Sequence, residues 1–445
     1  MNMLATEINI SGYYVLEKLY DSSRTLVYRA VREHDQQPVV IKLLKNPHPS
    51  FSELLQFRNQ YRIAKNINFP GIIQTYSLEP YKNGLFLVME DMGGISLNKY
   101  FTNIENITSQ NNILSSRLTK VFLEEFLLIA ISLCDTLDAL YHHKIIHKDI
   151  KPANILINPQ TKQIKLIDFS IASLLNREIQ NLTNPSVLEG TLGYISPEQT
   201  GRMNRGIDYR TDFYSLGVTF YELLTGELPF QSNDAMELLH CHIAKNPPEI
   251  SKPHPNPLLV KERGQEEQEI PQVLEDIVMK LMAKNAEDRY QSALGLKHDL
   301  EICLKQLQET GAIKYFKIAQ RDVCERFIIP EKLYGRETEV QELLAAFDRA
   351  SKDKSELKLV AGFSGIGKTA IINEVHKPIV KQNGYFIRGK FDQFNRNSPL
   401  DACVQAFRDL MGQLLGETDA QLSIWKSKIL TVLGDNAQVI VDVIP

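Results

Sequence analysis

The stretch 145-IIHKDIKPANILI-157 places three polar groups on one short loop. Asp149, Lys151 and Asn154 lie between a long helical pattern and an apolar strand pattern. Transfer of a γ-phosphoryl group to a hydroxyl requires a carboxylate that orients the acceptor, a cation at the transferring group and a metal ligand. This loop supplies all three within six residues. A lone acid here would more simply be part of a polar turn, so the interpretation depends on the flanking segments.

Two flanking segments strengthen it. The strand pattern 164-IKLID-168 ends in an acid, and a buried acid at a strand end costs free energy unless a cation pairs with it. Asp168 and Asn154 are therefore expected to hold Mg²⁺ against the phosphates of a nucleotide. Lys42 lies inside the apolar pattern 39-VVIKLL-44, where a nucleotide phosphate is a suitable anion. The order Lys, Asp-x-Lys-x-x-Asn, Asp-Phe is much more specific than any of its pieces.

On these residues the chain resembles a eukaryotic-type protein kinase over about residues 10–305. The resemblance implies an α+β two-lobed protein kinase fold, with ATP as phosphoryl donor and Mg²⁺ as cofactor. Lys151, two residues after Asp149, is typical of the serine/threonine class, so the implied partner is a protein with a Ser or Thr acceptor. Asp212 would brace the catalytic loop, and Arg289 would pair with Glu198. Other matches to family motifs are His147, Lys148, Phe169, Ser170, Thr191, Ser196 and Pro197.

The same resemblance assigns roles to individual residues. Asp149, Lys151 and Asn154 would be catalytic, and Asn154 and Asp168 would bind the metal ion. The residues that would contact the nucleotide are Val27, Lys42, Gln60, the gatekeeper Met89, the hinge residues Glu90 and Met92, and Leu156.

The stretch 19-LYDSSRTLVYRA-30 departs from the family. It aligns with the loop that covers the phosphates, but Tyr20, Ser22 and Thr25 stand at the three glycine positions. Since glycine lets backbone approach phosphate closely, we expect the hydroxyls of Ser22 and Thr25 to make contacts in its place. Gln60 replaces a glutamate that would pair with the strand lysine. These departures leave a second interpretation open, a pseudokinase that binds nucleotide as a scaffold and transfers nothing.

A second nucleotide motif follows. The stretch 362-GFSGIGKT-369 fits G-x-x-x-x-G-K-[ST], after the strand pattern 357-LKLVA-361 and before a helical pattern. Backbone N–H groups would cradle the phosphates, Lys368 would reach the β- and γ-phosphates, and Thr369 would bind Mg²⁺. The alternative is a flexible turn made by Gly362, Gly365 and Gly367, which the strand–loop–helix context disfavours.

The predicted organisation is a kinase domain at 10–305, a linker at 306–332 and a P-loop domain at 333–445. The entry 334-YGRE-337 resembles ATPase domains of the AAA/STAND type, and we expect only the N-terminal part of a partial α/β P-loop NTPase domain. The whole pattern resembles the N-terminal part of large bacterial proteins that join a serine/threonine kinase, an ATPase and a sensor histidine kinase. Downstream sensor and histidine kinase modules are thus possible partners. A third interpretation makes the P-loop unit the regulatory output of the kinase.

Composition limits the class of protein. A chain of 445 residues predicts two or three domains, and its 43% hydrophobic and 23% charged content is typical of globular proteins. The formal charge of −4 gives no indication of nucleic-acid binding. Five scattered cysteines argue against disulfide or zinc frameworks. With no signal peptide and no apolar run long enough to insert into a membrane, the sequence predicts a cytoplasmic protein.

Overall fold

The computed structural model separates into two compact units, which are described one at a time. The first contains residues 1–177, 208–229 and 247–327, and the second contains 178–207, 230–246 and 328–445. The residues that the structure describes are 8–110, 120–174, 190–201, 206–250, 270–324, 333, 335–352, 355–363, 365–374, 384–391, 400–414, 419–434 and 437–438.

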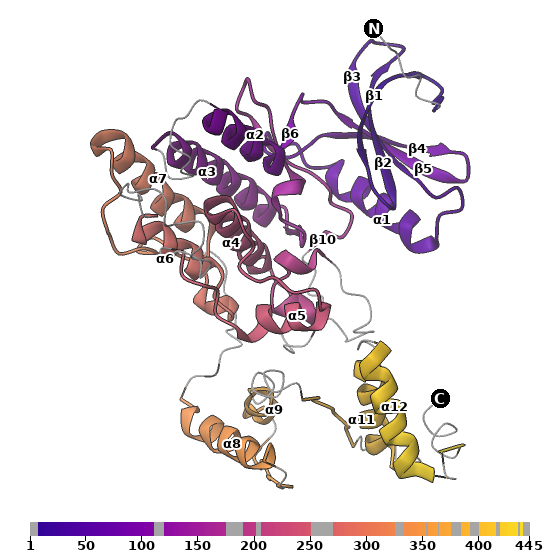
Figure 1. The fold of residues 1–445 in the computed structure, drawn as a ribbon, viewed down its shortest axis with the longest axis vertical. Coiled ribbons are helices and arrows are strands. Elements are labelled where there is room, and N and C mark those ends of the chain that lie inside the picture. Colours follow the sequence, from indigo (N-terminus) through magenta and orange to yellow (C-terminus); the bar gives the residue numbers. More distant parts are fainter. Residues whose placement is uncertain are drawn as a thin grey trace. The chain divides into compact units, whose positions relative to one another are not determined.

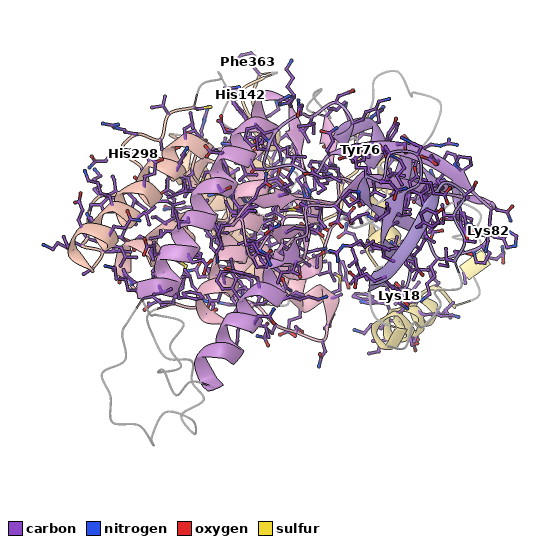
Figure 2. All side chains as sticks on the ribbon, turned by 90° about the horizontal axis from the view of Figure 1, so that it is seen from above. Lys18, Tyr76, Lys82, His142, His298 and Phe363 are labelled. Carbon is purple, nitrogen blue, oxygen red and sulfur yellow. The ribbon has the colours of Figure 1, made fainter. Side chains whose placement is uncertain are left out.

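A five-stranded antiparallel sheet forms one end of the first unit (Figure 1). Its strand order is β1-β2-β3-β5-β4. The strands are β1 (Tyr13–Asp21), β2 (Thr25–Arg32), β3 (Pro38–Leu44), β4 (Thr75–Tyr81) and β5 (Gly84–Glu90). Lys18 and Lys82, labelled in Figure 2, are exposed on β1 and after β4. This sheet forms one lobe of the predicted two-lobed fold.

Helix α1 (Phe51–Ala64) packs against β4 and β5. It begins with a capping box, in which Ser50 and Glu53 satisfy each other's backbone N–H groups. Two apolar clusters fix the sheet and the helix. One contains Tyr28, Val39, Ile41, Phe86 and Val88, and the other contains Leu44, Phe57, Ile73, Leu87 and Met89. Phe57 comes from α1, so the second cluster holds this helix on the sheet.

Helices dominate the other end of the first unit (Figure 1). The long α3 packs on α7, and α4 packs on α6. The helices are α2 (Leu97–Gln110), α3 (Lys120–His142), α4 (Arg210–Thr225), α6 (Gln272–Leu281) and α7 (Ala293–Thr310), with 3₁₀ turns η1 (Pro152–Asn154) and η4 (Ala286–Asp288). Almost every residue of α4 is buried, which makes it the central helix of this lobe.

Short strands carry the catalytic segments. The small sheet β6-β8-β9 consists of β6 (Ile95–Ser96), β8 (Ile155–Ile157) and β9 (Ile164–Leu166), and β7 (Ile145–Ile146) pairs with β10 (Ser173–Leu174). A turn that includes Asn158 and Pro159 joins β8 to β9, because Ile157 pairs with Ile164.

The chain after residue 305 differs from the predicted linker at 306–332. Helix α7 continues to Thr310 and ends at Gly311, which takes a left-handed conformation with φ of 77°. Residues 312–324 then contact α7 and its N-terminal end. The described part of this segment therefore packs on the first unit.

In its described residues, the second unit consists of helices and 3₁₀ turns joined by irregular segments. Its described elements are η2 (Leu192–Tyr194), η3 (Glu198–Thr200), α5 (Ala235–Ala244), α8 (Glu337–Ala350), α9 (Lys368–Asn373), α11 (Asp401–Leu414) and α12 (Asp419–Leu433). The strand predicted at 357–361 is wrong for the described structure: Leu357 and Leu359 are 94% and 91% exposed, and no described segment of this unit pairs with them. A strand needs a hydrogen-bonded neighbour, which the local pattern cannot supply.

Across the described residues, no helix has the length and apolar character needed to cross a membrane.

Candidate active site

The loop between β7 and β8 holds its polar side chains against one another. The Asp149 carboxylate accepts hydrogen bonds from the Lys151 Nζ at 2.6 Å and the Asn154 Nδ2 at 2.8 Å. Asn154 also donates to the Asp149 carbonyl at 2.8 Å. Asn154 is buried and ends η1, which begins with Pro152. The three residues predicted to be catalytic are therefore brought together by direct contacts.

A buried carboxylate on α4 holds the backbone of this loop. Asp212, in the first turn of α4, accepts hydrogen bonds from the backbone N–H groups of His147 and Lys148, both at 2.8 Å. Burial raises the pKa of Asp212, and the nearby His147 and these two donors oppose that rise. Lys148 adopts a φ of 67°, which is unfavourable for a residue with a side chain, so the Asp212 contacts help to hold a strained loop.

Lys42 stands between α1 and the end of β9. Its Nζ lies 2.9 Å from the Asp168 Oδ1 and donates to the Gln60 Oε1 at 3.1 Å. Gln60 is 1% exposed and its amide also contacts the Met89 sulfur at 3.9 Å. The neutral Gln60 thus occupies the position predicted for it, and Asp168 supplies the negative charge beside the Lys42 ammonium.

The surroundings of the Asp168 carboxyl favour its ionised form. Burial alone would raise its pKa, but the Lys42 cation and hydrogen bonds outweigh burial, and the pKa falls to about 2. Its backbone is in the left-handed region, with φ of 65°. The following Phe169 is fully buried and its ring lies 4.8 Å from the His147 ring. The backbone strain at Asp168 is of the kind that clusters at functional sites.

Asn154 and Asp168 also fit a magnesium ion. The Asn154 amide uses its Nδ2 for Asp149, and within the described residues its Oδ1 makes no hydrogen bond. The Ile167 N–H donates to the Asn154 carbonyl at 2.9 Å, which ties the asparagine to the residue before Asp168. A carboxylate and an amide oxygen are ligands that Mg²⁺ prefers.

The hinge after β5 is held by charges and amides. The Glu90 carboxylate pairs with the Lys165 Nζ on β9 at 2.7 Å, and the Met92 carbonyl accepts from Asn158 at 2.7 Å. Among the described residues, the Met92 N–H donates to no protein atom. Leu156 lies beside the hinge, since a Cβ added at Gly94 would come within 3.3 Å of it.

The glycine-free loop is a closed turn. The Ser22 hydroxyl oxygen accepts hydrogen bonds from the backbone N–H groups of Thr25 at 2.8 Å and Arg24 at 3.2 Å. The Ser22 N–H donates to the Thr25 carbonyl at 2.9 Å. On β2, Val27 pairs in register with Tyr20 of β1 and with Lys42 of β3. Ser22 therefore binds its own loop, where the sequence predicted a contact to phosphate.

The P-loop has the backbone expected of its motif. Gly365 and Gly367 have φ values of 81° and 95°, which residues with side chains rarely adopt. Gly367 is the N-cap of α9, and the Lys368 Nζ donates to the carbonyls of Gly362 and Phe363, both at 2.8 Å. Thr369 follows in the first turn of α9 and is exposed.

Comparison with known families supports this geometry. The model of the protein kinase domain matches residues 13–300, and the model of an AAA ATPase domain matches residues 332–442. The chain belongs to the protein kinase family. An AAA ATPase domain follows its kinase domain, so the predicted fold class and the fusion of the two domains are confirmed.

The chain is also similar to individual proteins. The chain is 33% identical over 420 residues to the hybrid signal transduction histidine kinase G of Dictyostelium discoideum, covering 74% of this chain and 12% of that protein. It is 30% identical over 328 residues to the serine/threonine-protein kinase PknB of Mycolicibacterium smegmatis, covering 72% and 47%. PrkC of Bacillus subtilis is 30% identical over 296 residues, covering 66% and 40%. The chain spans less than half the length of each of these relatives.

One contact of the kinase site was missed from the sequence. Asn59, next to Gln60 on α1, donates to the carbonyls of Ser170 at 3.2 Å and Ala172 at 2.9 Å. It therefore ties α1 to the segment that follows Asp168. No local pattern marks Asn59, since it lies 111 residues from Ser170 in the chain and only the tertiary structure joins them.

Proposed function

We propose that the kinase domain transfers the γ-phosphoryl group of ATP to a Ser or Thr hydroxyl of a protein substrate. The observation that carries this proposal is the connected set of side chains around Lys42 and Asp149. Asp149 contacts Lys151 and Asn154, and Lys42 contacts Asp168, all at 2.6–2.9 Å. Kinships to PknB and PrkC, which are named serine/threonine-protein kinases, support the acceptor class.

Each residue has one task in this reaction. Asp149 orients the acceptor hydroxyl and accepts its proton, since its carboxylate is the acid at the centre of the loop. Lys151 and Lys42 neutralise phosphate charge. Asn154 and Asp168 would hold Mg²⁺, which neutralises the phosphate oxygens when it is bound.

The nucleotide base would lie against the hinge. The Met92 N–H, which donates to no protein atom among the described residues, supports this placement, because an adenine edge needs a backbone donor. Met89, Glu90 and Leu156 border the same position, and Val27 would cover it from β2. The proposed kinase domain is residues 10–305, with 306–332 leading to the ATPase domain at 333–445.

The transfer test uses γ-³²P-labelled ATP with Mg²⁺ and dephosphorylated casein as the acceptor. The chain is expected to label casein on Ser or Thr, and Asp168→Asn is expected to abolish labelling while the protein stays folded. Replacing Mg²⁺ by EDTA should have the same effect. Labelling that survives in Asp168→Asn would contradict the proposed metal site.

A pseudokinase is the second candidate, and the closed turn at Ser22 favours it. Its N–H groups at Arg24 and Thr25 already have a partner, so the loop offers phosphate fewer donors. A folded chain that binds ATP in calorimetry but labels no acceptor would support this candidate.

We also propose that the P-loop of the second unit binds a nucleotide and Mg²⁺, through Lys368 and Thr369. Together the two modules would act in bacterial signal transduction, with sensor and histidine kinase modules as partners. The similarity to a hybrid signal transduction histidine kinase supports this context. We propose a cytoplasmic location, since the five cysteines are free thiols, as expected in a reducing compartment.

A further inference from the structure

The segment after α7 is fastened to the kinase domain by one carboxylate. Asp322 accepts hydrogen bonds from the backbone N–H groups of Gln291 at 2.8 Å and Ser292 at 2.9 Å, and from the Ser292 hydroxyl at 3.0 Å. Ser292 is the N-cap of α7. Asp322 lies outside residues 13–300, the part of the chain that the kinase family model matches.

The helix is shaped to receive this segment. A Cβ added at Gly295 would come within 2.6 Å of the Asp322 Cα, so only glycine permits the observed approach. A second contact lies beside it, where the Asp299 carboxylate accepts from the Ala319 N–H at 2.7 Å and from the Tyr290 hydroxyl at 2.6 Å. Asp299 and Tyr290 are both buried, so the segment is part of the packed unit.

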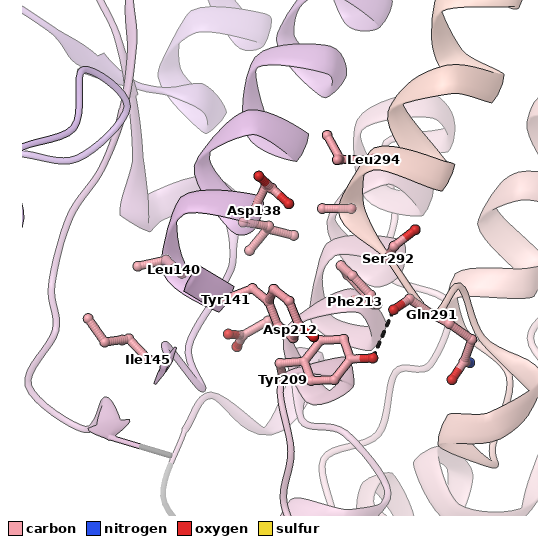
Figure 3. Close-up of a pocket in the computed structure, with 12 residues that line it drawn as sticks. Asp138, Leu140, Tyr141, Ile145, Tyr209, Asp212, Phe213, Gln291, Ser292 and Leu294 are labelled. Carbon is pink, nitrogen blue, oxygen red and sulfur yellow. Dashed lines mark hydrogen bonds between the residues drawn. The ribbon is translucent and has the colours of Figure 1, made fainter. Parts of the chain in front are cut away.

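Hydrogen bonds of Gln291 extend from Asp322 to the start of α4. The Gln291 carbonyl accepts from the Tyr209 hydroxyl at 2.8 Å, the dashed contact in Figure 3. The Gln291 side chain accepts from the Arg210 guanidinium at 2.9 Å. Tyr209 also lies 3.7 Å from the Cys324 sulfur, at the far end of the described segment. Gln291 thus joins the carboxylate of Asp322 to the first residues of α4.

The start of α4 supports the catalytic loop. Arg210 and Asp212 share the first turn of this helix, and Asp212 holds the N–H groups of His147 and Lys148. Figure 3 shows Tyr209, Asp212 and Gln291 around one small pocket between α3, α4 and the start of α7. A continuous series of hydrogen bonds and one helical turn therefore connects Asp322 to the loop that carries Asp149.

We propose that Asp322 is a positioning residue for phosphoryl transfer, acting through Gln291 and α4 on the catalytic loop. The segment 312–324 is then a functional part of the kinase, although it lies beyond the family's domain. This inference rests on the proposed transfer activity for its kinetic consequence, but its structural consequence at residues 145–150 does not.

The test compares the full chain with Asp322→Asn, Asp322→Ala and Gly295→Ala. The last variant closes the space that Asp322 occupies and leaves every polar group in place, and alanine is a better helix former than glycine. Hydrogen–deuterium exchange is expected to quicken in a peptide that covers 145–150, most in Asp322→Ala and less in Asp322→Asn. The kcat for casein is expected to fall roughly 2- to 30-fold, the range of effects along a coupling network. The KM for ATP is expected to stay unchanged, because Lys42 and the hinge are untouched.

Gln306→Ala is the matched control. Gln306 holds the same segment by accepting from the Lys314 N–H at 2.7 Å, but among the described residues its side chain makes no hydrogen bond to α4. Its exchange at 145–150 and its kcat should equal those of the unchanged chain. Unaltered exchange at 145–150 in both Asp322→Ala and Gly295→Ala would overturn the proposal, whether or not the chain labels casein. Quickened exchange with no labelling of casein by the unchanged chain would instead contradict the proposed transfer activity alone.

Discussion

The P-loop and the kinase site differ in how well they agree with their motifs and in how deeply their residues are buried. The P-loop at 362–369 fits its motif at every defined position, yet Leu357 and Leu359 before it are 94% and 91% exposed. The kinase site has no glycine at the three glycine positions of its phosphate loop, yet Lys42, Gln60 and Asn154 are buried and joined to partners.

The difference separates two sources of a binding site. A P-loop is made by local backbone, so positive φ at Gly365 and Gly367 needs little from the rest of the fold. A kinase site is made by side chains from β3, α1, the catalytic loop and β9, which only a packed lobe brings together. Agreement with the motif is therefore evidence for a P-loop, whereas burial of the side chains is evidence for a kinase site.

The largest expected effect concerns the acid at the centre of the kinase site. Asp149→Asn should lower kcat by about 10²- to 10⁴-fold, the usual contribution of general acid–base groups. The KM for ATP should hardly change, because the proposed partner of Asp149 is the acceptor hydroxyl. Steady-state labelling of casein measures both, and Glu125→Gln, an acid paired with Lys162 away from the site, is the control. A loss of ATP affinity equal to the loss in kcat would mean that Asp149 binds the nucleotide.

The next effect tests the other region. Lys368→Ala should weaken nucleotide binding at the P-loop by roughly 10- to 100-fold, since a charge-assisted hydrogen bond contributes about 1.5–3 kcal/mol. Calorimetry in a Lys42→Met background, which weakens the kinase site, isolates this binding. The labelling of casein by Lys368→Ala alone is expected to equal that of the unchanged chain. A change in labelling would instead support a regulatory role for the P-loop unit.

A smaller effect is expected at Asn59. Asn59→Ala removes two hydrogen bonds between α1 and the segment after Asp168. At about 1 kcal/mol for each bond, kcat should fall roughly 5- to 30-fold. Arg58→Ala, at the exposed neighbouring position on α1, is the matched control. Equal rates for the Asn59 and Arg58 variants would show that Gln60 and Lys42 alone position the helix.

The smallest effect concerns the glycine-free loop. Ser22→Gly combined with Thr25→Gly removes the hydroxyl that occupies the N–H groups of Arg24 and Thr25. ATP should then bind about 2- to 5-fold more tightly, because one or two freed donors can face phosphate. Calorimetry with Lys368→Ala in both proteins reads the kinase site alone. Unchanged affinity would place this loop away from the phosphates.

The sequence predicted most of the first unit because its signals are short in range. The spacing from Asp149 to Asn154, the acid after 164-IKLI-167 and the lysine inside β3 each lie within a few residues, and all three segments adopt the expected elements. It failed at the strand expected over 357–361, because pairing depends on a neighbour elsewhere in the chain. It also predicted a linker from residue 306, although the described residues 306–324 pack on the first unit, since no local signal distinguishes a linker from a segment that packs.

The sequence by itself determined the family, the two-lobed fold and the residue types around the phosphates. Only the tertiary structure decided how those residues are held. Gln60 and Asp168 hold Lys42, and Asn59 holds α1. Asp212 holds the catalytic loop, and Asp322 holds Gln291. The reason is physical. A motif is a property of neighbouring residues, whereas a buried hydrogen bond joins groups from distant parts of the chain, and its partner is fixed only when the core has closed around both.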